Sequence, residues 1–372
     1  MKKIAVIGTS NSIIKDGYGQ FLLELLPGQV DIWGLGGCSS LHAVFSLLKY
    51  ELCDKYEYIV FDFCINDYSF TRKKKINTYL ILAYWSFVFD MLRKSNTTPI
   101  FLLLSVRSGN RQIVDFYIKM ARLFNVEYID VPNYFRNIRR EQLYRDHVHY
   151  TGDIQRKISL LILERMNQHK SEMRSISLDG DIRFYVLNHK LSERKEIRKT
   201  SLVEMECYAI DTRQENIVFP QDAGYISGIL FWSDGPEGGV YDLLDIHDAT
   251  SRVQEDLNLE YRGFFVRELA ASLPEGLKAP VISFQQAATS HVDSIPLKRN
   301  PLFYVNSFLF CTVPPVAWGK AFYQRHKAVL KESFRQRVQY GVFLLRMLAQ
   351  KAASAVTRMR QACGKLSSRK NA

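Results

Sequence analysis

A serine, an aspartate and a histidine in this sequence have the residue types that nucleophilic catalysis requires. Ser10 lies in the turn GTSNS that follows the apolar run KIAVIG, and Asp146 and His149 lie three residues apart in DHVH. A histidine can remove the proton of an attacking serine hydroxyl, and an aspartate fixes the tautomer and orientation of that histidine. These residues therefore predict acyl transfer through an acyl-serine. Each motif alone also has a structural explanation, because serine and asparagine form turns and cap helices.

Two further motifs contain hydrogen-bond donors for the negative charge that develops on an attacked carbonyl oxygen. The segment GLGGCSS contains Gly37, and the segment CIND contains Asn66. The backbone N–H groups of Ser10 and Gly37 and the side-chain amide of Asn66 are suited to form an oxyanion hole. Loss of one such donor typically raises the barrier by about 3–4 kcal/mol. Gly36 and Gly37 could equally be turn glycines, and Asn66 with Asp67 could cap a helix.

The elements around these motifs must position them. Short apolar runs, rich in β-branched and aromatic residues, predict buried parallel strands at residues 3–8, 30–36, 56–64, 98–106 and 126–131. Apolar residues at helical spacing predict helices between and after the strands, at residues 17–26, 39–52, 74–94, 112–124 and 151–167. This alternation predicts an α/β fold with a parallel sheet covered by helices on both faces. Ligands of such sheets bind beyond the carboxyl ends of the strands, where the four motifs lie.

In the order and positions of the four motifs, residues 1–167 resemble the SGNH, or GDSL-type, hydrolases. GTSNS stands where the family has Gly-Asp-Ser-x-Ser, GGCSS matches its glycine block, CIND its Gly-x-Asn-Asp block and DHVH its Asp-x-x-His block. The resemblance implies a flavodoxin-like three-layer α/β/α domain with a mostly parallel five-stranded sheet. It implies that Ser10 is the nucleophile, with Asp146 and His149 as the rest of the triad. It also implies an oxyanion hole formed by Ser10, Gly37 and Asn66.

Two positions depart from the family pattern. Thr9 stands where the family has aspartate, and Cys64 stands where it has glycine. These departures concern the residues that support the nucleophile turn and shape the pocket. The serine, glycine, asparagine and histidine that give the family pattern its name are all present.

Other titratable residues have structural explanations. His147, beside the triad motif, is predicted to be a loop residue, and His42 is predicted to be packed. A group in the segment YDLLDIHDAT suggests a metal site, but its spacing matches no standard site; it consists of Asp242, Asp245, His247 and Asp248. We therefore predict a solvated turn there, with no metal and no cofactor.

The chain beyond the first domain changes in pattern. We predict a catalytic domain over residues 1–169, a polar linker over 170–180, a β-rich accessory domain over 181–315 and a basic helical tail over 316–372. Strand-like runs separated by turn signals predict an antiparallel sandwich or jelly roll; they lie at residues 182–189, 201–210, 215–220, 224–233, 239–246, 263–269, 280–287 and 302–313. This domain is expected to bind carbohydrate, to pack over the active-site edge or to build an oligomer.

The formal net charge of +12 belongs wholly to the tail. Residues 316–372 contain 13 Lys and Arg and a single acidic residue, and the rest of the chain is balanced with 37 of each sign. The charge therefore gives no reason to expect nucleic acid as a partner. The tail predicts an amphipathic helix with an apolar stripe that includes Leu330, Phe334 and Val338. Its basic face fits an anionic membrane surface, and it equally fits a helix docked on protein.

The cysteines and the hydropathy bear on cellular location. The six cysteines form no CxxC pair, the apolar run after Lys3 is too short for a signal peptide, and no segment is long enough to span a membrane. We therefore expect a cytoplasmic protein without disulfides, peripheral at the inner face of the membrane if the tail binds there.

Two hypotheses of function follow. The first is a serine esterase or O-acyltransferase that acts on acylated carbohydrate in surface polysaccharide metabolism. The second is a non-catalytic glycan-binding or scaffold protein on a degenerate SGNH fold. The complete Ser10, Asp146 and His149 set favours the first hypothesis. It does not distinguish water from a sugar hydroxyl as the acyl acceptor, because both reactions pass through the same acyl-enzyme.

Overall fold

The computed structural model describes residues 3–168, 172–176, 182–187, 191–200, 203–211, 216–220, 222–234, 243–247, 252–256, 262–272, 278, 280–285 and 302–330. Residues 1–325 form one unit, and a second unit begins at His326. Within the first unit, an α/β part is followed along the chain by a β-rich part.

The α/β part is built on a parallel sheet whose five strands match the five predicted from the sequence. These are β1 (Ile4–Ile7), β2 (Val30–Ile32), β3 (Tyr58–Phe61), β4 (Thr98–Leu103) and β5 (Glu127–Asp130). The spatial order is β2-β1-β3-β4-β5, and every neighbouring pair is parallel. The chain thus proceeds outward from β1 in both directions, which creates a switch point between β1 and β3.

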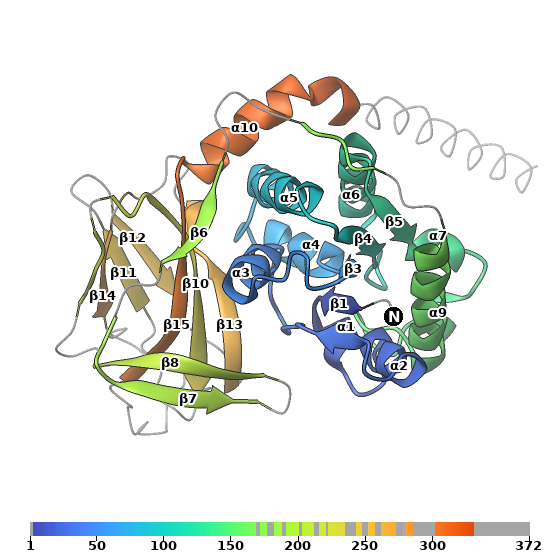
Figure 1. The fold of residues 1–372 in the computed structure, drawn as a ribbon, viewed down its shortest axis with the longest axis horizontal. Coiled ribbons are helices and arrows are strands. Elements are labelled where there is room, and N and C mark those ends of the chain that lie inside the picture. The colour runs from blue at the N-terminus through green and yellow to red at the C-terminus, as the bar shows by residue number, and fades with distance from the viewer. Residues whose placement is uncertain are drawn as a thin grey trace, which may run out of the picture. The chain divides into compact units, whose positions relative to one another are not determined.

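Helices cover both faces of this sheet (Figure 1). They are α1 (Ser10–Ile13), α2 (Tyr18–Leu25), α3 (Leu41–Tyr50), α4 (Cys64–Arg72), α5 (Thr78–Arg93), α6 (Arg111–Phe124), α7 (Val131–Tyr134), α8 (Arg140–Leu143) and α9 (Gly152–Asn167). The sequence predicted α2, α3, α5, α6 and α9. It did not predict α4, whose polar and apolar residues show little helical periodicity.

The two faces have separate cores. On one face, Tyr18 of α2 and Ile158 of α9 share an apolar cluster with Val6 and other strand residues. On the other face, the indole of Trp85 in α5 lies edge-on to the rings of Phe61 and Phe101, at centroid distances of 5.1 and 4.5 Å. The predicted three-layer α/β/α arrangement is therefore confirmed.

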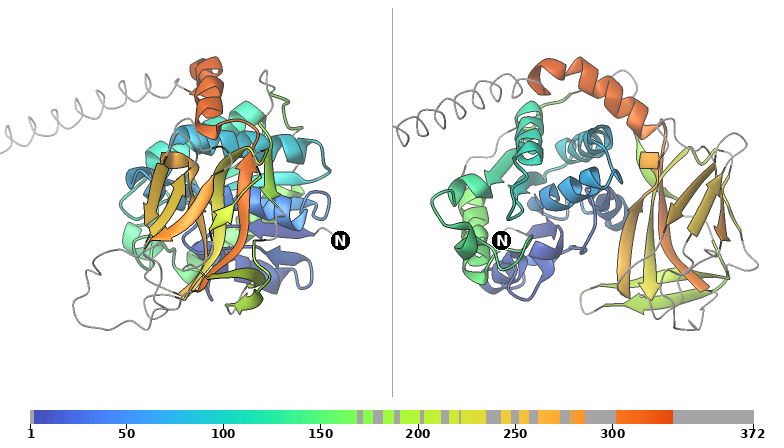
Figure 2. Two further views of the ribbon diagram at one scale, coloured as in Figure 1. Left: turned by 90° about the vertical axis from the view of Figure 1, so that its left-hand side faces the viewer. Right: turned by 180° about the vertical axis from the view of Figure 1, so that it is seen from behind.

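The β-rich part consists of antiparallel strands in two sheets (Figure 2). The strands are β6 (Phe184–Leu187), β7 (Lys195–Lys199), β8 (Glu204–Asp211), β9 (Ile217–Val218), β10 (Tyr225–Asp234), β11 (Leu243–His247), β12 (Arg252–Asp256), β13 (Arg262–Glu268), β14 (Val281–Gln285) and β15 (Leu302–Cys311). One sheet has the order β13-β10-β15-β8-β7, with β6 also paired to β15, and the other has the order β12-β11-β14-β9. Apolar residues of both sheets, including Phe231 and Leu244, form one core. The predicted sandwich is confirmed.

The sequence missed two strands of the sandwich, β7 and β12. Their sequences, KEIRK and RVQED, are mostly charged or polar, and each strand forms the edge of its sheet. An edge strand can carry charged side chains because one of its sides has no neighbouring strand. Hydrophobic alternation, the signal used for strands, is therefore weakest there.

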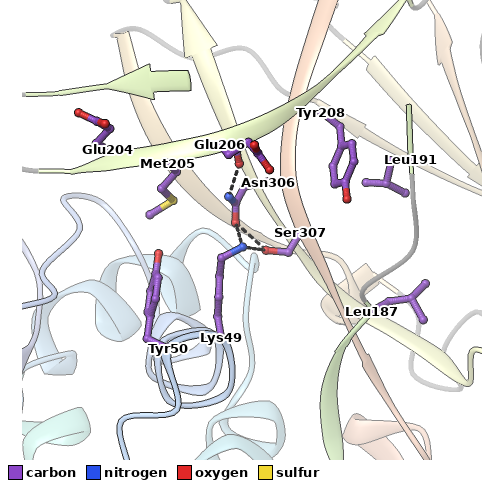
Figure 3. A pocket seen from close by; sticks show the side chains of 10 residues that line it. All are labelled: Lys49, Tyr50, Leu187, Leu191, Glu204, Met205, Glu206, Tyr208, Asn306 and Ser307. Atoms are coloured by element: carbon purple, nitrogen blue, oxygen red, sulfur yellow. Dashed lines mark hydrogen bonds between the residues drawn. The ribbon is translucent and has the colours of Figure 1, made fainter. Parts of the chain in front are cut away.

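The central strands β10 and β15 are buried along almost their whole length, on the face away from the sandwich core as well. That second face lies against the α/β part. A side chain at Gly228 of β10 would place its Cβ only 2.4 Å from Leu41 of α3. Lys49, at the end of α3, donates to the side chains of Asn306 and Ser307 on β15, beside a cavity of about 320 Å³ (Figure 3).

The helix α10 (Pro315–Arg325) closes the first unit by packing on α5. A Cβ at Gly319 would lie 2.0 Å from the Tyr79 carbonyl oxygen, and the ring of Phe322 stacks on that of Phe124. The start of the predicted tail is thus part of the packed protein. The predicted stripe and basic face beyond Leu330 lie outside the described residues. Among the described residues, no helix has the length and apolar character needed to cross a membrane.

Candidate active site

The predicted site residues lie at the carboxyl ends of three adjacent strands. Ser10 is the first residue of α1, directly after β1, and Asn66 lies in the first turn of α4, after β3. Gly37 lies in the loop that follows β2. Since β1 lies between β2 and β3, the three motifs meet at the switch point of the sheet, where α/β proteins bind their ligands.

A chain of hydrogen bonds joins the three residues predicted to form a triad. His149 Nε2 lies 2.9 Å from Ser10 Oγ, and His149 Nδ1 lies 2.7 Å from Asp146 Oδ2. The imidazole thus lies between the hydroxyl and the carboxylate, which is the geometry of a serine activated by a general base. The side chain of His149 is 20% exposed and that of Asp146 is 47% exposed, so the site opens to solvent.

The second carboxylate oxygen of Asp146 holds its own loop in place. Asp146 Oδ1 accepts the backbone N–H groups of Val148 and His149, each at 2.8 Å. Partial burial opposes ionisation, but the bonds from these two N–H groups and from the imidazole outweigh it and lower the pKa of Asp146 to about 2. Asp146 is therefore negatively charged at neutral pH and can stabilise an imidazolium.

Asn11 connects the nucleophile turn to this loop, a role that the sequence did not reveal. Asn11 Nδ2 donates to the Val148 carbonyl oxygen at 3.2 Å, and Asn11 Oδ1 accepts from Gln155 Nε2 at 2.8 Å. Gln155 Oε1 in turn accepts from the backbone N–H of Tyr18 at 3.3 Å. Asn11 and Gln155 are almost fully buried, so these amides fix the position of α1 relative to the loop from residue 144 to 150.

Asp62 supports the nucleophile turn by hydrogen bonds, a role that the sequence also did not reveal. Its carboxylate accepts the backbone N–H of Thr9 and, at 2.7 Å, the hydroxyl of Tyr18. A Cβ at Gly8 would lie 2.5 Å from Asp62 Oδ1, which explains the glycine before the nucleophile. Burial raises the pKa of Asp62 to about 7, although the bonds from Tyr18 and Thr9 favour its charged form.

The predicted oxyanion donors are held by their own bonds. Gly37 has a φ of 65°, a conformation that favours glycine. Asn66 Nδ2 donates to the Cys38 carbonyl oxygen at 2.9 Å, which connects α4 to the Gly37 loop. The next residue, Asp67, accepts the Ser40 N–H at 2.9 Å and the Tyr117 hydroxyl at 2.6 Å. In the described part of the chain, the backbone N–H groups of Ser10 and Gly37 donate to no acceptor.

The two positions that depart from the family pattern are both buried. Thr9 is 1% exposed, and its backbone N–H donates to Asp62 Oδ1. Cys64 is the first residue of α4 and has no exposed surface, so its thiol belongs to the core. Burial raises the pKa of this thiol well above its usual range.

Two histidines outside the predicted triad, His147 and His42, lie as predicted. His147 is an exposed loop residue, and its carbonyl oxygen accepts the Arg107 N–H. His42 is 4% exposed, and its Nε2 lies 2.8 Å from the Trp33 carbonyl oxygen. Burial lowers the pKa of His42 to about 4, against the effect of that hydrogen bond.

The prediction of a solvated turn in YDLLDIHDAT was wrong for its central residues. Asp245 and His247 belong to strand β11, and Asp245 is 2% exposed because β11 lies between β12 and β14. Asp242 and Asp248 lie outside the described residues. Within the described ranges, no three His, Cys, Asp or Glu side chains are grouped to hold a metal ion.

Comparisons with known proteins show which solved structures have a similar fold. No protein-family model matches the sequence, and a search of curated proteins gave no match. The structure resembles a two-domain esterase (CEX) active on acetylated mannans, with a TM-score of 0.55 and 12% identity over 83% of this chain and 91% of that chain. The chain shares its fold with a two-domain esterase. This likeness extends over most of both chains, so the resemblance covers the β-rich part as well as the α/β part.

Two further structures were compared. A two-domain esterase of the same description, co-crystallised with mannopentaose, gives a TM-score of 0.54 at 12% identity over 83% of this chain and 90% of that chain. A member of the lipolytic protein G-D-S-L family from Veillonella parvula DSM 2008 matches 44% of this chain and 96% of that chain, at 14% identity and a TM-score of 0.36.

Proposed function

We propose that this protein is a serine esterase that acts on acylated carbohydrate. The observation that carries the proposal is the hydrogen-bonded series Ser10–His149–Asp146 at the switch point of the sheet. The shared fold with a two-domain esterase active on acetylated mannans supports the carbohydrate ester as substrate.

The residues perform the reaction in two halves. Ser10 Oγ attacks the carbonyl carbon of the ester while its proton passes to His149 Nε2, and the carbonyl oxygen becomes an oxyanion. The backbone N–H groups of Ser10 and Gly37 and the Asn66 amide stabilise that oxyanion. The tetrahedral intermediate then expels the sugar oxygen, which takes the proton from His149, and the acyl group stays on Ser10. Asp146 stabilises the imidazolium throughout.

The second half returns the enzyme to its starting state. An acceptor O–H attacks the acyl-serine, gives its proton to His149, and leaves Ser10 protonated after the acyl group departs. With water as the acceptor the protein is a hydrolase, and with a sugar hydroxyl it is an O-acyltransferase. We propose the hydrolase, because the side chains of His149 and Asp146 are accessible to solvent water.

The test combines a panel of acyl esters with detection of the acyl-enzyme by intact-mass spectrometry. Acetylated oligosaccharides and 4-nitrophenyl acetate are supplied with and without free sugar acceptors. We expect ester hydrolysis by the wild-type protein and a transient acyl adduct on Ser10. Ser10→Ala should lower turnover by at least about a thousandfold while the melting temperature stays unchanged. Binding of acetylated oligosaccharides without any turnover would favour the scaffold hypothesis instead.

A further inference from the structure

A cavity beside the loop that carries Asp146 and His149 has no part in the mechanism above. Its volume is about 260 Å³, and it lies between residues 105–114 and residues 131–150. Tyr144 and Tyr150 line it, and Tyr150 directly follows His149 in the chain. The hydroxyls of these two tyrosines bond to Ser105 Oγ at 2.6 and 3.0 Å. One wall of the cavity is therefore the loop that positions the proposed general base.

The cavity contains a buried amide that has no partner. Asn110 precedes α6 as its N-cap residue, but its side chain makes no hydrogen bond to the helix. It is 3% exposed, and neither Oδ1 nor Nδ2 has a partner in the described part of the chain. A buried polar group left unpaired destabilises the folded protein, so such groups call for an explanation. A ligand in the cavity that both donates and accepts would pair both atoms.

The charge around this amide is positive. Four arginines line the cavity, Arg107, Arg111, Arg136 and Arg140, and its described lining contains no carboxylate. Arg111 pairs with Asp115 and Asp130, and Arg107 lies 4.0 Å from Glu141.

The other two arginines are available to a ligand. Arg136 and Arg140 are exposed, and within the described ranges neither forms an ion pair. The N-terminus of α6, which contributes Asn110 and Arg111 to the wall, adds the positive end of a helix dipole. A site with these features favours an anion, and the planar guanidinium matches a carboxylate or a phosphate group.

The rest of the wall is apolar. Val114, Val131 and Phe135 line it together with the tyrosine rings. A sugar residue has apolar C–H faces, hydroxyls that both donate and accept, and, when acidic, one charged group. These three features match the apolar wall, the Asn110 amide and the exposed arginines in turn.

We propose that this cavity is a subsite for an anionic sugar residue, carrying a carboxylate or a phosphate, in the substrate of the esterase. The proposal rests on the proposed function, since it gives the glycan chain its chemical class. It predicts that acetylated acidic glycans are better substrates than acetylated neutral glycans.

The first experiment compares substrates. The ratio of kcat/KM for acetylated polygalacturonate to that for acetylated glucomannan is measured with the wild-type protein and two variants. The double variant Arg136→Gln/Arg140→Gln should lower this ratio roughly tenfold, and added salt should lower it for the wild type by screening. Arg139→Gln is the matched control, because Arg139 is also exposed and adjacent in the chain but does not line the cavity. A ratio that is the same in the wild type and the double variant would overturn the proposal.

The second experiment measures binding without chemistry. Trigalacturonate, glucose 6-phosphate and the neutral maltotriose are titrated into the wild-type protein by calorimetry. An anionic probe should bind at least about tenfold more tightly than maltotriose, and the double variant should lose that difference. Which anion binds identifies the charged group as a carboxylate or a phosphate. Equal affinity for all three probes would overturn the proposal, whether or not the protein hydrolyses 4-nitrophenyl acetate, which tests the esterase function separately.

The third variant tests whether the Asn110 amide binds the ligand or has only a structural role. Asn110→Leu removes a buried unpaired amide, so the melting temperature should rise or stay the same. Affinity for the anionic probe should fall several-fold. Unchanged affinity in a protein that remains folded would exclude Asn110 from the subsite and contradict its pairing with a sugar.

Discussion

The side-chain amide of Asn66 has two N–H bonds, and the structure accounts for one of them. That bond points to the Cys38 carbonyl oxygen at 2.9 Å, which holds the amide beside the Gly37 loop. This bond also fixes the direction of the second N–H. The amide therefore does not have to reorganise when an oxyanion forms. Such preorganised donors act on the transition state more than on the bound substrate.

Replacing Asn66 by alanine should therefore lower kcat far more than it raises KM. We expect a loss in kcat of roughly 10²–10³-fold, with KM changed by less than about threefold. Steady-state kinetics on a soluble acetyl ester give both constants, and the melting temperature reports any loss caused by the missing bond to Cys38. An effect confined to KM would make Asn66 a residue that binds substrate in the ground state.

Asn11 acts through other residues, because it contacts the loop and not the reacting atoms. Asn11→Ala leaves the Val148 carbonyl and the Gln155 amide buried without this partner, which should cost about 1–3 kcal/mol of stability. The loosened loop should lower kcat by roughly 10–100-fold, since small displacements of a general base are costly. Both effects are measured by thermal unfolding and kinetics.

Asp16→Asn provides the control for Asn11. It weakens the ion pair between Asp16 and Arg145, at 2.9 Å, which connects the same two segments at the exposed surface. Exposed ion pairs contribute about 0–1 kcal/mol, so this variant should stay close to wild type in kcat. If Asp16→Asn impaired kcat as strongly as Asn11→Ala, the buried amide would have no special role.

At the residue scale, the sequence predicted the residues that share a motif and missed those that support them. Ser10, Asp146 and His149 occur in motifs whose spacing can be recognised along the chain. Asn11 and Asp62 have no such spacing, because their partners lie about 137 and 53 residues away and are brought near only by the fold. A polar residue inside the apolar run YIVFDF was the only signal for Asp62.

At the scale of elements, Asp62 joins the end of β3 to the turn after β1 and to α2. Its carboxyl has a pKa of about 7 in the folded protein against 3.8 in an unfolded chain. Below about pH 4 both states hold the proton, and between pH 4 and 7 only the folded state does. This group therefore contributes stability at low pH that is lost as the pH rises to about 7, by up to about 1.4 kcal/mol per pH unit.

Asp62→Asn should remove this dependence. The amide keeps an oxygen for the Thr9 N–H and can donate to the Tyr18 hydroxyl, so the contacts are preserved without a titrating group. Between pH 5 and 8 the melting temperature of the wild type should fall relative to that of Asp62→Asn. Parallel curves for the two proteins would show that the Asp62 carboxyl does not titrate in this range.

The agreement between the predicted and the observed helices and strands also has a physical cause. All five strands of the parallel sheet were predicted. The inner strands β1, β3 and β4 are buried on both faces, so each appears in the sequence as an apolar run. The edge strands β7 and β12 were missed because charged residues suit their exposed side. Helix α4 was missed because its positions are set by the Asn66 and Asp67 contacts and not by an apolar stripe.

At the scale of the whole molecule, most of the net charge lies beyond Leu330. Residues 331–372 contain ten Lys and Arg and one acidic residue. We predict that the full-length protein sediments with vesicles containing anionic lipid, less so at high salt, and that a chain ending at Leu330 does not. Because α10 is retained in this truncation, it should keep the melting temperature and the activity on 4-nitrophenyl acetate. Vesicle binding by the truncated chain would assign the membrane contact to another part of the protein.

Synthesis of this chain on the ribosome leaves the α/β part incomplete for a long interval. Residues 1–168 emerge first, yet Leu41 and Tyr84 are covered only when β10 and Glu268 of β13 arrive, and α5 receives α10 last of all. The apolar surfaces of α3 and α5 are thus exposed to other nascent chains until the strands β10 and β15 have been made. A gene fragment that ends after residue 169 would encode the proposed catalytic residues. It would lack the strands and the helix that cover α3 and α5. The α/β part is therefore not expected to fold efficiently on its own, and its yield as a separate product should depend on chaperones or on solubilising substitutions along α3 and α5.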